Sequence, residues 1–114
     1  MFTIIANLEI KDNLKIIEDI KTILKDNVQV AEVYQDNYNN YIYSIPSNTK
    51  IIISLGGDGT VLQSVQNAIE LDIPILAFNT GTLGFLAEHN IKDLEFILNQ
   101  CIRNNYKIEN RFLI

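Results

Sequence analysis

The chain has 114 residues, of which 47% are hydrophobic and 20% charged, and its formal net charge is −5. This length and composition predict one globular domain that needs no disulfide or metal to hold its core. The acidic balance argues against a nucleic-acid surface, because affinity for the phosphate backbone comes from clustered Lys and Arg. No apolar stretch reaches the roughly 20 residues of a membrane span and no signal peptide is evident, so we expect a cytoplasmic protein without a membrane partner.

The first half of the chain changes its hydrophobic period several times. Residues 1–7 form an apolar run that predicts a buried strand. From Asp12 the apolar residues fall on one stripe, which predicts a helix of about four turns capped by Asp12 or Asn13. Residues 28–34 predict a second strand.

Residues 35–49 break every period and predict a polar loop. The tyrosines of this segment could stack on a base or a sugar. Tyrosines that pack on the surface of their own loop are the alternative that we favour, so the segment is assigned no chemistry.

The second half alternates strands and helices. Residues 50–55 are aliphatic on both faces, as expected of a central parallel strand. A helix, a strand at 73–78, a helix capped by Asn90 and a closing strand in 106–114 follow. The stripe of the first of these helices comprises Val61, Leu62, Val65, Ala68, Ile69 and Leu71. The order predicts an α/β fold, a doubly wound and mainly parallel sheet of about five strands with helices on both faces, and a single domain over residues 1–114.

Cys101 and His89 are each the single residue of their type. Cys101 has no CxxC partner, and we interpret it as a thiol packed in the core. His89 has no second imidazole at ligand spacing, so we interpret it as a loop or helix-entry residue and assign no metal ligands.

Two glycine-containing segments follow the third and fourth predicted strands: GGDGT at residues 56–60 and NTGTLGF at 79–85. Ligands bind beyond the carboxyl ends of strands in open α/β sheets, so we expect both segments to face one crevice. Gly56 and Gly57 can take positive φ and let a phosphate approach the backbone N–H groups. Gly59 and Thr60 open the next helix, whose N-terminus favours an anion.

Asp58 stands inside the first of these turns. A carboxylate beside a phosphate lowers affinity, so it needs another task, such as accepting a proton from a hydroxyl or helping to hold Mg²⁺. The turn is no Walker A loop, since no Lys follows, and Leu62 occupies the third glycine position of GxGxxG. A helix-capping Asp in a tight turn is the alternative explanation.

The combination of LGGDGT and NTGTLGFLAE resembles the NAD kinase family, which uses ATP to phosphorylate the adenosine ribose 2′-hydroxyl of NAD. The resemblance is close over residues 50–114, including the closing RFLI, and topological over 1–34. It implies ATP as the donor, Mg²⁺ or another divalent metal, NAD as the substrate, and a homo-oligomeric full-length enzyme. It implies these roles: Asp58 as proton acceptor; Gly56, Gly57, Gly59 and Thr60 on the phosphate side; Leu62 and Phe85 as an apolar floor under the adenine; Asn79, Thr80 and Gly81 in the opposite loop.

NAD kinases continue into a β-rich second domain with further adenine and ribose contacts. The sequence stops before such a domain, so the resemblance implies an N-terminal domain that is inactive alone. Residues 7–13 lack the Pro or Gly usual there, and no ligand contact is assigned to them. One alternative is a lipid kinase of the diacylglycerol or sphingosine type, which the NTGTLGF segment disfavours. A non-catalytic nucleotide-sensing module is another, which the presence of Asp58 disfavours.

Overall fold

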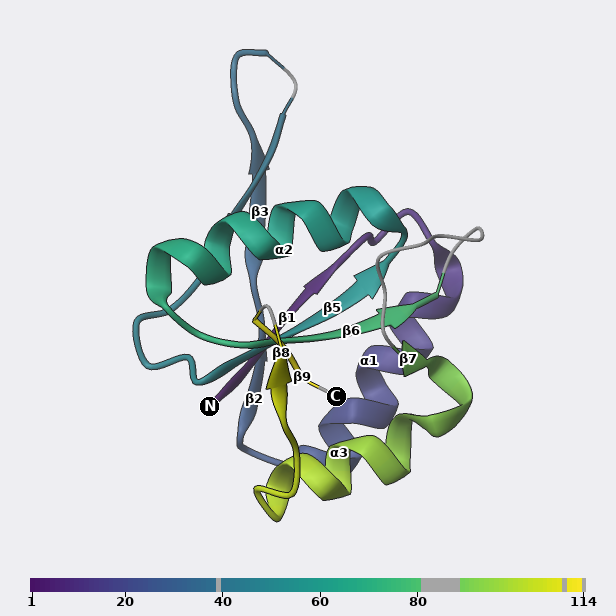
Figure 1. Ribbon diagram of the computed structural model, residues 1–114. Coiled ribbons are helices and arrows are strands. Elements are labelled where there is room, and N and C mark those ends of the chain that lie inside the picture. The colour runs from purple at the N-terminus through teal and green to yellow at the C-terminus, as the bar shows by residue number, and fades with distance from the viewer. Residues whose placement is uncertain (39, 81–88, 110, 114) are drawn as a thin grey trace.

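The computed structural model describes residues 1–38, 40–80, 89–109 and 111–113 (Figure 1). The N-terminal elements are β1 (Phe2–Ala6), α1 (Lys11–Leu24), β2 (Val28–Val30), β3 (Glu32–Gln35) and β4 (Tyr41–Ser44). The remaining elements are β5 (Ile51–Gly56), α2 (Asp58–Leu71), β6 (Ile75–Asn79), β7 (His89–Asn90), the 3-10 helix η1 (Ile91–Asp93), α3 (Leu94–Ile102), β8 (Ile108–Glu109) and β9 (Phe112–Leu113).

The main sheet is parallel except at one edge. Its strand order is β2-β1-β5-β6-β9-β8, and β7 pairs with β6 beside this path. All pairings are parallel except that of β8 with β9. The predicted α/β fold is thereby confirmed. The closing strand is a short antiparallel pair, β8 and β9, rather than one strand.

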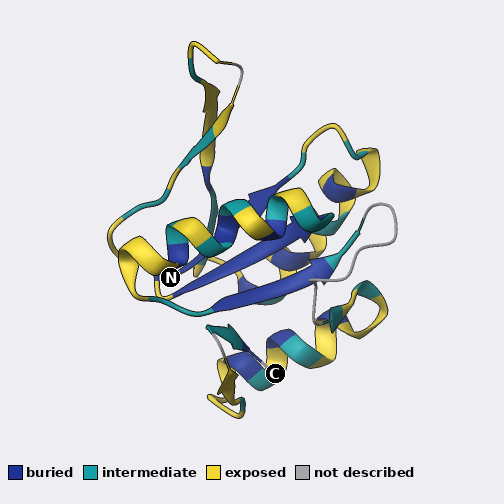
Figure 2. Cartoon of the chain, turned by 45° about the horizontal axis from the view of Figure 1, so that its top comes forward, coloured by how far each residue is buried: buried dark blue, intermediate teal, exposed yellow. Residues whose placement is uncertain are grey.

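Helices cover both faces of the sheet, as Figure 1 shows. On one face, α1 and α3 pack together and share a core with alternate strand residues such as Ile4 and Ile53. On the other face, α2 packs against the intervening residues, among them Ile5 and Ile52. The strands between them are buried along their length (Figure 2). A strand sandwiched in this way needs apolar side chains on both faces, which explains the continuous aliphatic runs of β1 and β5.

The prediction of one strand over residues 28–34 was wrong. β2 pairs with β1, and the Ala31 N–H donates to the Ile4 carbonyl at 2.8 Å. Beyond Ala31 the chain leaves the sheet, and β3 pairs with β4 in a separate antiparallel hairpin. The predicted loop at 35–49 therefore contains a strand. Figure 1 shows this hairpin projecting from the domain.

The predicted cap of α1 was also wrong. The N-cap is Ile10, without a side-chain hydrogen bond, and Asp12 lies in the first turn. Asn13 is fully buried, and its Nδ2 donates to the carbonyls of Asn7 at 2.7 Å and Leu55 at 3.4 Å. Its side chain therefore joins α1 to the carboxyl ends of two neighbouring strands.

The predicted stripe of α2 is correct only in part. Val61 and Ala68 are buried, but Leu62 and Ile69 are 55% and 56% exposed. Ser64 occupies the buried position between the first two, where its hydroxyl donates to the Thr60 carbonyl at 2.9 Å. The number of apolar residues in this helix is therefore larger than the number that it buries.

The two single residues lie in the second half of the chain. Cys101 is buried in α3, as predicted, and burial raises the pKa of its thiol to about 11. His89 lies in β7 rather than in a loop, with its Nε2 2.7 Å from the Leu113 carbonyl oxygen. Asn90 caps η1, not α3, by accepting a hydrogen bond from the Lys92 N–H.

Candidate functional site

The two predicted loops leave neighbouring strands at the same edge of the sheet. β5 and β6 are parallel neighbours, and Gly56 pairs in register with Asn79. The Thr80 N–H donates to the Gly56 carbonyl at 3.3 Å, so the first residues of the two segments are hydrogen-bonded. The expected juxtaposition of the two segments is confirmed at this point, while Gly81 and Phe85 lie outside the described residues.

The first position of the GGDGT turn requires a glycine. Gly56 has a φ of 154°, and a Cβ on it would lie 2.5 Å from Oγ1 and 2.9 Å from Cβ of Thr60. β5 therefore passes directly into the first turn of α2 without room for a side chain. Gly57 is the N-cap of α2 and has a φ of −93°, so the positive φ expected there was wrong.

The space beside the other two glycines is open. Apart from the chain neighbours of each glycine and the nearby backbone of α2, no described atom lies within 4 Å of a Cβ built on Gly57 or Gly59. The first N–H groups of a helix lack partners in the preceding turn and carry the positive end of the helix dipole. An approach to the N-terminus of α2 that no described side chain blocks suits an anion such as a phosphate.

Asp58 is the first residue of α2 and is partly buried. Leu62 follows it by one turn, so Asp58 and Leu62 lie on the same side of the helix. Gly59 and Gln63 form a second stripe, about 100° around the helix axis from the first. Asp58 therefore stands between two surfaces of α2, one with an exposed leucine and one that borders a cavity.

The loop after β6 presents buried oxygen atoms at the same edge. Oδ1 of Asn79 and Oγ1 of Thr80 are buried and have no hydrogen-bond partner among the described residues. Buried polar atoms of this kind are normally satisfied by protein, water or a ligand. Asn79 and Thr80 lie beside Gly56, through strand pairing and the backbone hydrogen bond respectively.

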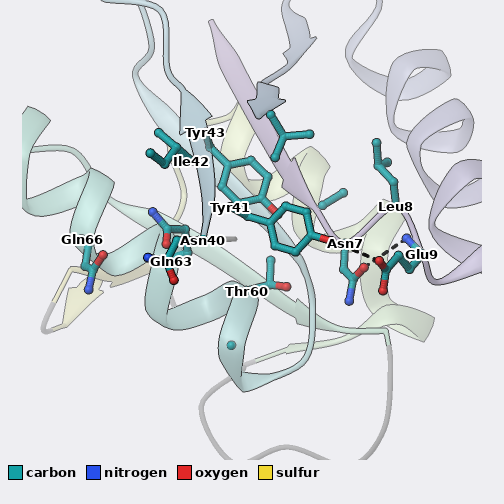
Figure 3. A pocket seen from close by; sticks show the side chains of 13 residues that line it. Asn7, Leu8, Glu9, Asn40, Tyr41, Ile42, Tyr43, Thr60, Gln63 and Gln66 are labelled. Carbon is teal, nitrogen blue, oxygen red and sulfur yellow. Dashed lines mark hydrogen bonds between the residues drawn. The ribbon is translucent and has the colours of Figure 1, made fainter. Parts of the chain in front are cut away.

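A cavity that the sequence did not predict adjoins this turn. It measures about 890 Å³ and lies between the loop after β1, strand β4 and helix α2 (Figure 3). Its lining comprises Ala6, Asn7, Leu8, Glu9, Val33, Asn40, Tyr41, Ile42, Tyr43, Gly59, Thr60, Gln63 and Gln66. The tyrosines of residues 35–49 were the available signal, but their position beside α2 depends on the hairpin fold.

A hydrogen bond crosses this cavity. Figure 3 shows the Tyr41 ring reaching from the hairpin toward the loop after β1, where its hydroxyl donates to Glu9 Oε1 at 3.1 Å. The bond to Glu9 raises the pKa of Tyr41, so the phenol stays protonated at neutral pH. The Glu9 N–H in turn donates to Asn7 Oδ1 at 3.0 Å.

The described residues contain neither a cluster of metal ligands nor a membrane-spanning helix. Within residues 1–38, 40–80, 89–109 and 111–113, no three His, Cys, Asp or Glu side chains gather as a metal site would require. Among these residues there is also no helix with the length and hydrophobicity needed to cross a bilayer.

Comparison with known proteins identifies the family to which the chain belongs. Residues 20–106 match the family model of the ATP-NAD kinase N-terminal domain. An NAD kinase of Lachnoclostridium phytofermentans is 38% identical over 117 aligned residues, which cover 99% of this chain and 41% of the relative. An NAD kinase of Pyrococcus furiosus is 34% identical over 99% of this chain and 43% of its own length.

A solved structure shares the fold. The crystal structure of an NAD kinase from Archaeoglobus fulgidus in complex with ATP matches with a TM-score of 0.59 at 24% identity, over 91% of this chain and 38% of that one. The chain thus spans less than half the length of each of these three proteins. The family match covers most of the chain, and the chain belongs to the ATP-NAD kinase family, whose N-terminal domain it matches.

Proposed function

We propose that this chain is the N-terminal domain of an enzyme that transfers the γ-phosphoryl group of ATP to the adenosine ribose 2′-hydroxyl of NAD. The observation that carries the proposal is the position of Asp58, which is the first residue of α2 and lies two residues after Gly56, the residue of β5 that pairs in register with Asn79. The names of the relatives support the reaction, and the ATP complex of the Archaeoglobus fulgidus protein supports the donor.

In this proposal Asp58 accepts the proton of the 2′-hydroxyl. A bond then forms between the 2′-oxygen and the γ-phosphorus, the bond from that phosphorus to the β,γ-bridging oxygen breaks, and ADP leaves. A positioned base of this kind contributes about 10²–10⁴ in rate. Asp58 stands on the first turn of α2, where the helix dipole favours a negative charge.

The phosphates of the donor approach the start of α2. Gly57, Gly59 and Thr60 supply backbone N–H groups there, and no described atom fills the space beside the two glycines. Gly56 permits this turn, because a side chain at that position would clash with Thr60.

Mg²⁺ or another divalent metal would neutralise charge on the phosphates. Because Mg²⁺ in such sites is held mostly by substrate phosphates and water, the phosphates of the donor would supply most of its ligands.

The acceptor lies on the other surface of α2. Leu62 is 55% exposed, and an apolar side chain one turn from Asp58 suits the face of an adenine. Phe85 would complete this floor, and Gly81 would continue the loop that begins with Asn79 and Thr80. Asn79 and Thr80 carry buried side-chain oxygens without a hydrogen-bond partner among the described residues.

The remainder of the site is supplied by a further domain. The relatives are more than twice as long as the part that this chain matches, and we propose that their additional, β-rich domain closes over the edge of the sheet. Holding two reactants in register provides roughly 7–11 kcal/mol of a barrier, so the 114-residue chain alone should turn over poorly. We also propose that the complete enzyme is a cytoplasmic homo-oligomer.

The proposal is tested by completing the site. The chain replaces the matching segment of the Lachnoclostridium phytofermentans relative, and the fusion, checked for folding by circular dichroism, is incubated with Mg-ATP and NAD. NADP is read with an NADP-specific dehydrogenase. We expect NADP from the fusion, far less from the chain alone, and no product when diacylglycerol replaces NAD. A folded fusion that makes no NADP would contradict the proposal, and the Pyrococcus furiosus relative provides a second host.

A further inference from the structure

The cavity beneath the β3–β4 hairpin, here called the hairpin cavity, extends from the N-terminus of α2 along the helix. Gly59 and Thr60 line one end and Gln66 the other. At a rise of 1.5 Å per residue, Gly59 and Gln66 are about 10 Å apart along the helix axis. A group bound at the start of α2 can therefore continue into the cavity.

The lining of the hairpin cavity is unsuited to a long polyanion. None of its described residues is Lys or Arg, and its one charged side chain is the carboxylate of Glu9. Beyond the first turn of α2, additional phosphates would meet no positive charge and would be repelled by Glu9.

The same lining suits a flat, polar ring with a sugar attached. Tyr41 and Tyr43 contribute aromatic faces, on which bases stack with little dependence on their identity. Asn40, Gln63 and Gln66 contribute amides, each of which can donate and accept hydrogen bonds at a ring edge or a ribose hydroxyl.

Tyr41 is held in place from two sides. Its hydroxyl donates a hydrogen bond to Glu9, and the backbone N–H of its neighbour Asn40 donates to Asp36 in the hairpin turn. There Asp36 Oδ1 accepts hydrogen bonds from the N–H groups of Tyr38 at 2.8 Å and Asn40 at 2.9 Å. These bonds to Asn40 and Tyr38 lower the pKa of Asp36, so its carboxylate stays ionised at neutral pH. A ring fixed in this way loses little conformational freedom when a ligand binds.

We propose that the hairpin cavity binds the base and ribose of the phosphate donor, and that Tyr41 is a specificity residue favouring a nucleoside triphosphate over a bare polyphosphate chain. The inference rests on the proposed function for the identity of the donor. It assigns a role to the Tyr- and Asn-rich segment 35–49, which the reaction itself does not use.

The test measures binding by isothermal titration calorimetry to the 114-residue chain, with Mg-ATP and inorganic tripolyphosphate as probes. ATP should bind more tightly than tripolyphosphate. Tyr41→Ala should weaken ATP binding by about 5- to 10-fold, which is the lower end of the affinity loss expected when one base loses its stacking partner. Tripolyphosphate binding should change less than 2-fold.

Two variants control for the hairpin itself. Tyr38 is 85% exposed and does not line the cavity, so Tyr38→Ala should leave ATP affinity unchanged. Tyr41→Phe keeps the ring and loses the bond to Glu9, so it should retain most of the affinity. Equal effects of Tyr38→Ala and Tyr41→Ala, ATP binding no tighter than tripolyphosphate, or no ATP binding at millimolar concentration would each overturn the inference.

The same variants in the fusion enzyme separate this inference from the proposed reaction. Tyr41→Ala should raise KM for ATP at least 5-fold while kcat and KM for NAD change less than 2-fold, because Tyr41 lines the hairpin cavity and neither Asp58 nor Leu62 does. An active fusion whose KM for ATP is insensitive to Tyr41→Ala would overturn the inference and leave the reaction standing. An inactive fusion with Tyr41-dependent ATP binding by the chain would overturn the reaction alone.

Discussion

Gly56→Ala should destabilise the domain strongly, although it adds one methyl group. The new Cβ would lie 2.5 Å from Thr60 Oγ1 and 2.9 Å from Thr60 Cβ, and the φ of 154° is rarely adopted by residues with a side chain. β5 is paired with β1 on one side and β6 on the other, so its backbone cannot move away without disturbing both ladders.

The cost of this substitution has three parts. A strained backbone costs about 1–3 kcal/mol and overpacking about 1–3 kcal/mol. The lower entropy of the unfolded chain offsets about 0.4–1 kcal/mol. These terms sum to about 1–6 kcal/mol, and we expect a loss near the middle of that range, about 2–4 kcal/mol, out of a total stability of about 5–15 kcal/mol for a typical domain.

Gly59→Ala is the matched control, because Gly59 is the third glycine of the same segment and is the second residue of α2. Apart from its chain neighbours and the nearby backbone of α2, no described atom lies within 4 Å of its Cβ, and Ala is about 1 kcal/mol better than Gly in a helix interior. Urea unfolding followed by circular dichroism should show the midpoint falling by roughly 1–2 M for Gly56→Ala and unchanged or raised for Gly59→Ala. A Gly56→Ala midpoint within error of the wild type would refute the reasoning.

Three further predictions concern other parts of the fold. Asn13→Ala removes two buried hydrogen bonds to backbone carbonyls and should cost about 1–3 kcal/mol in urea unfolding, and a loss below about 0.5 kcal/mol would contradict the role of Asn13. Lys25 has a φ of 57° and a ψ of −123°, so Lys25→Gly should raise the thermal midpoint by about 4–8 °C, whereas Lys21→Gly within α1 should lower it. Burial raises the pKa of Cys101 to about 11, so the contribution of the buried thiol to the free energy of unfolding is complete below about pH 9 and is lost as the pH rises toward 11. A thiol reagent should react slowly with Cys101 at pH 8 until urea unfolds the chain. Fast labelling of the folded protein would contradict this prediction.

The strands of the central sheet could be predicted because they are buried on both faces. β1, β5 and β6 each appear in the sequence as an aliphatic run, which a strand between two helix layers requires. The hairpin could not be predicted in the same way. Its strands are largely exposed and mix tyrosine with polar residues, and the break at Ala31 carries no Gly or Pro signal.

The candidate site likewise has one part that could be predicted from the sequence and one part that could not. Gly56 and Asn79 could be expected together because parallel strands end at one edge, which is a property of the topology. The hairpin cavity depends on the contact of Glu9 with Tyr41, 32 residues apart, and on the exit of β3 from the sheet. Neither follows from a local pattern, so the sequence revealed the tyrosines without their position.

The central claim is that Asp58 accepts the proton of the NAD 2′-hydroxyl. The most direct measurement is the rate of NADP formation by the fusion enzyme carrying Asp58→Asn, compared with Asp72→Asn at the opposite, C-terminal end of α2. Asp72 has a side chain that is 88% exposed and pairs only with Arg111 among the described salt bridges, so its loss should matter little. We expect kcat to fall by about 10²–10⁴ for Asp58→Asn with ATP binding retained, and to stay within 2-fold for Asp72→Asn. Near-normal turnover by the Asp58→Asn enzyme would contradict the account.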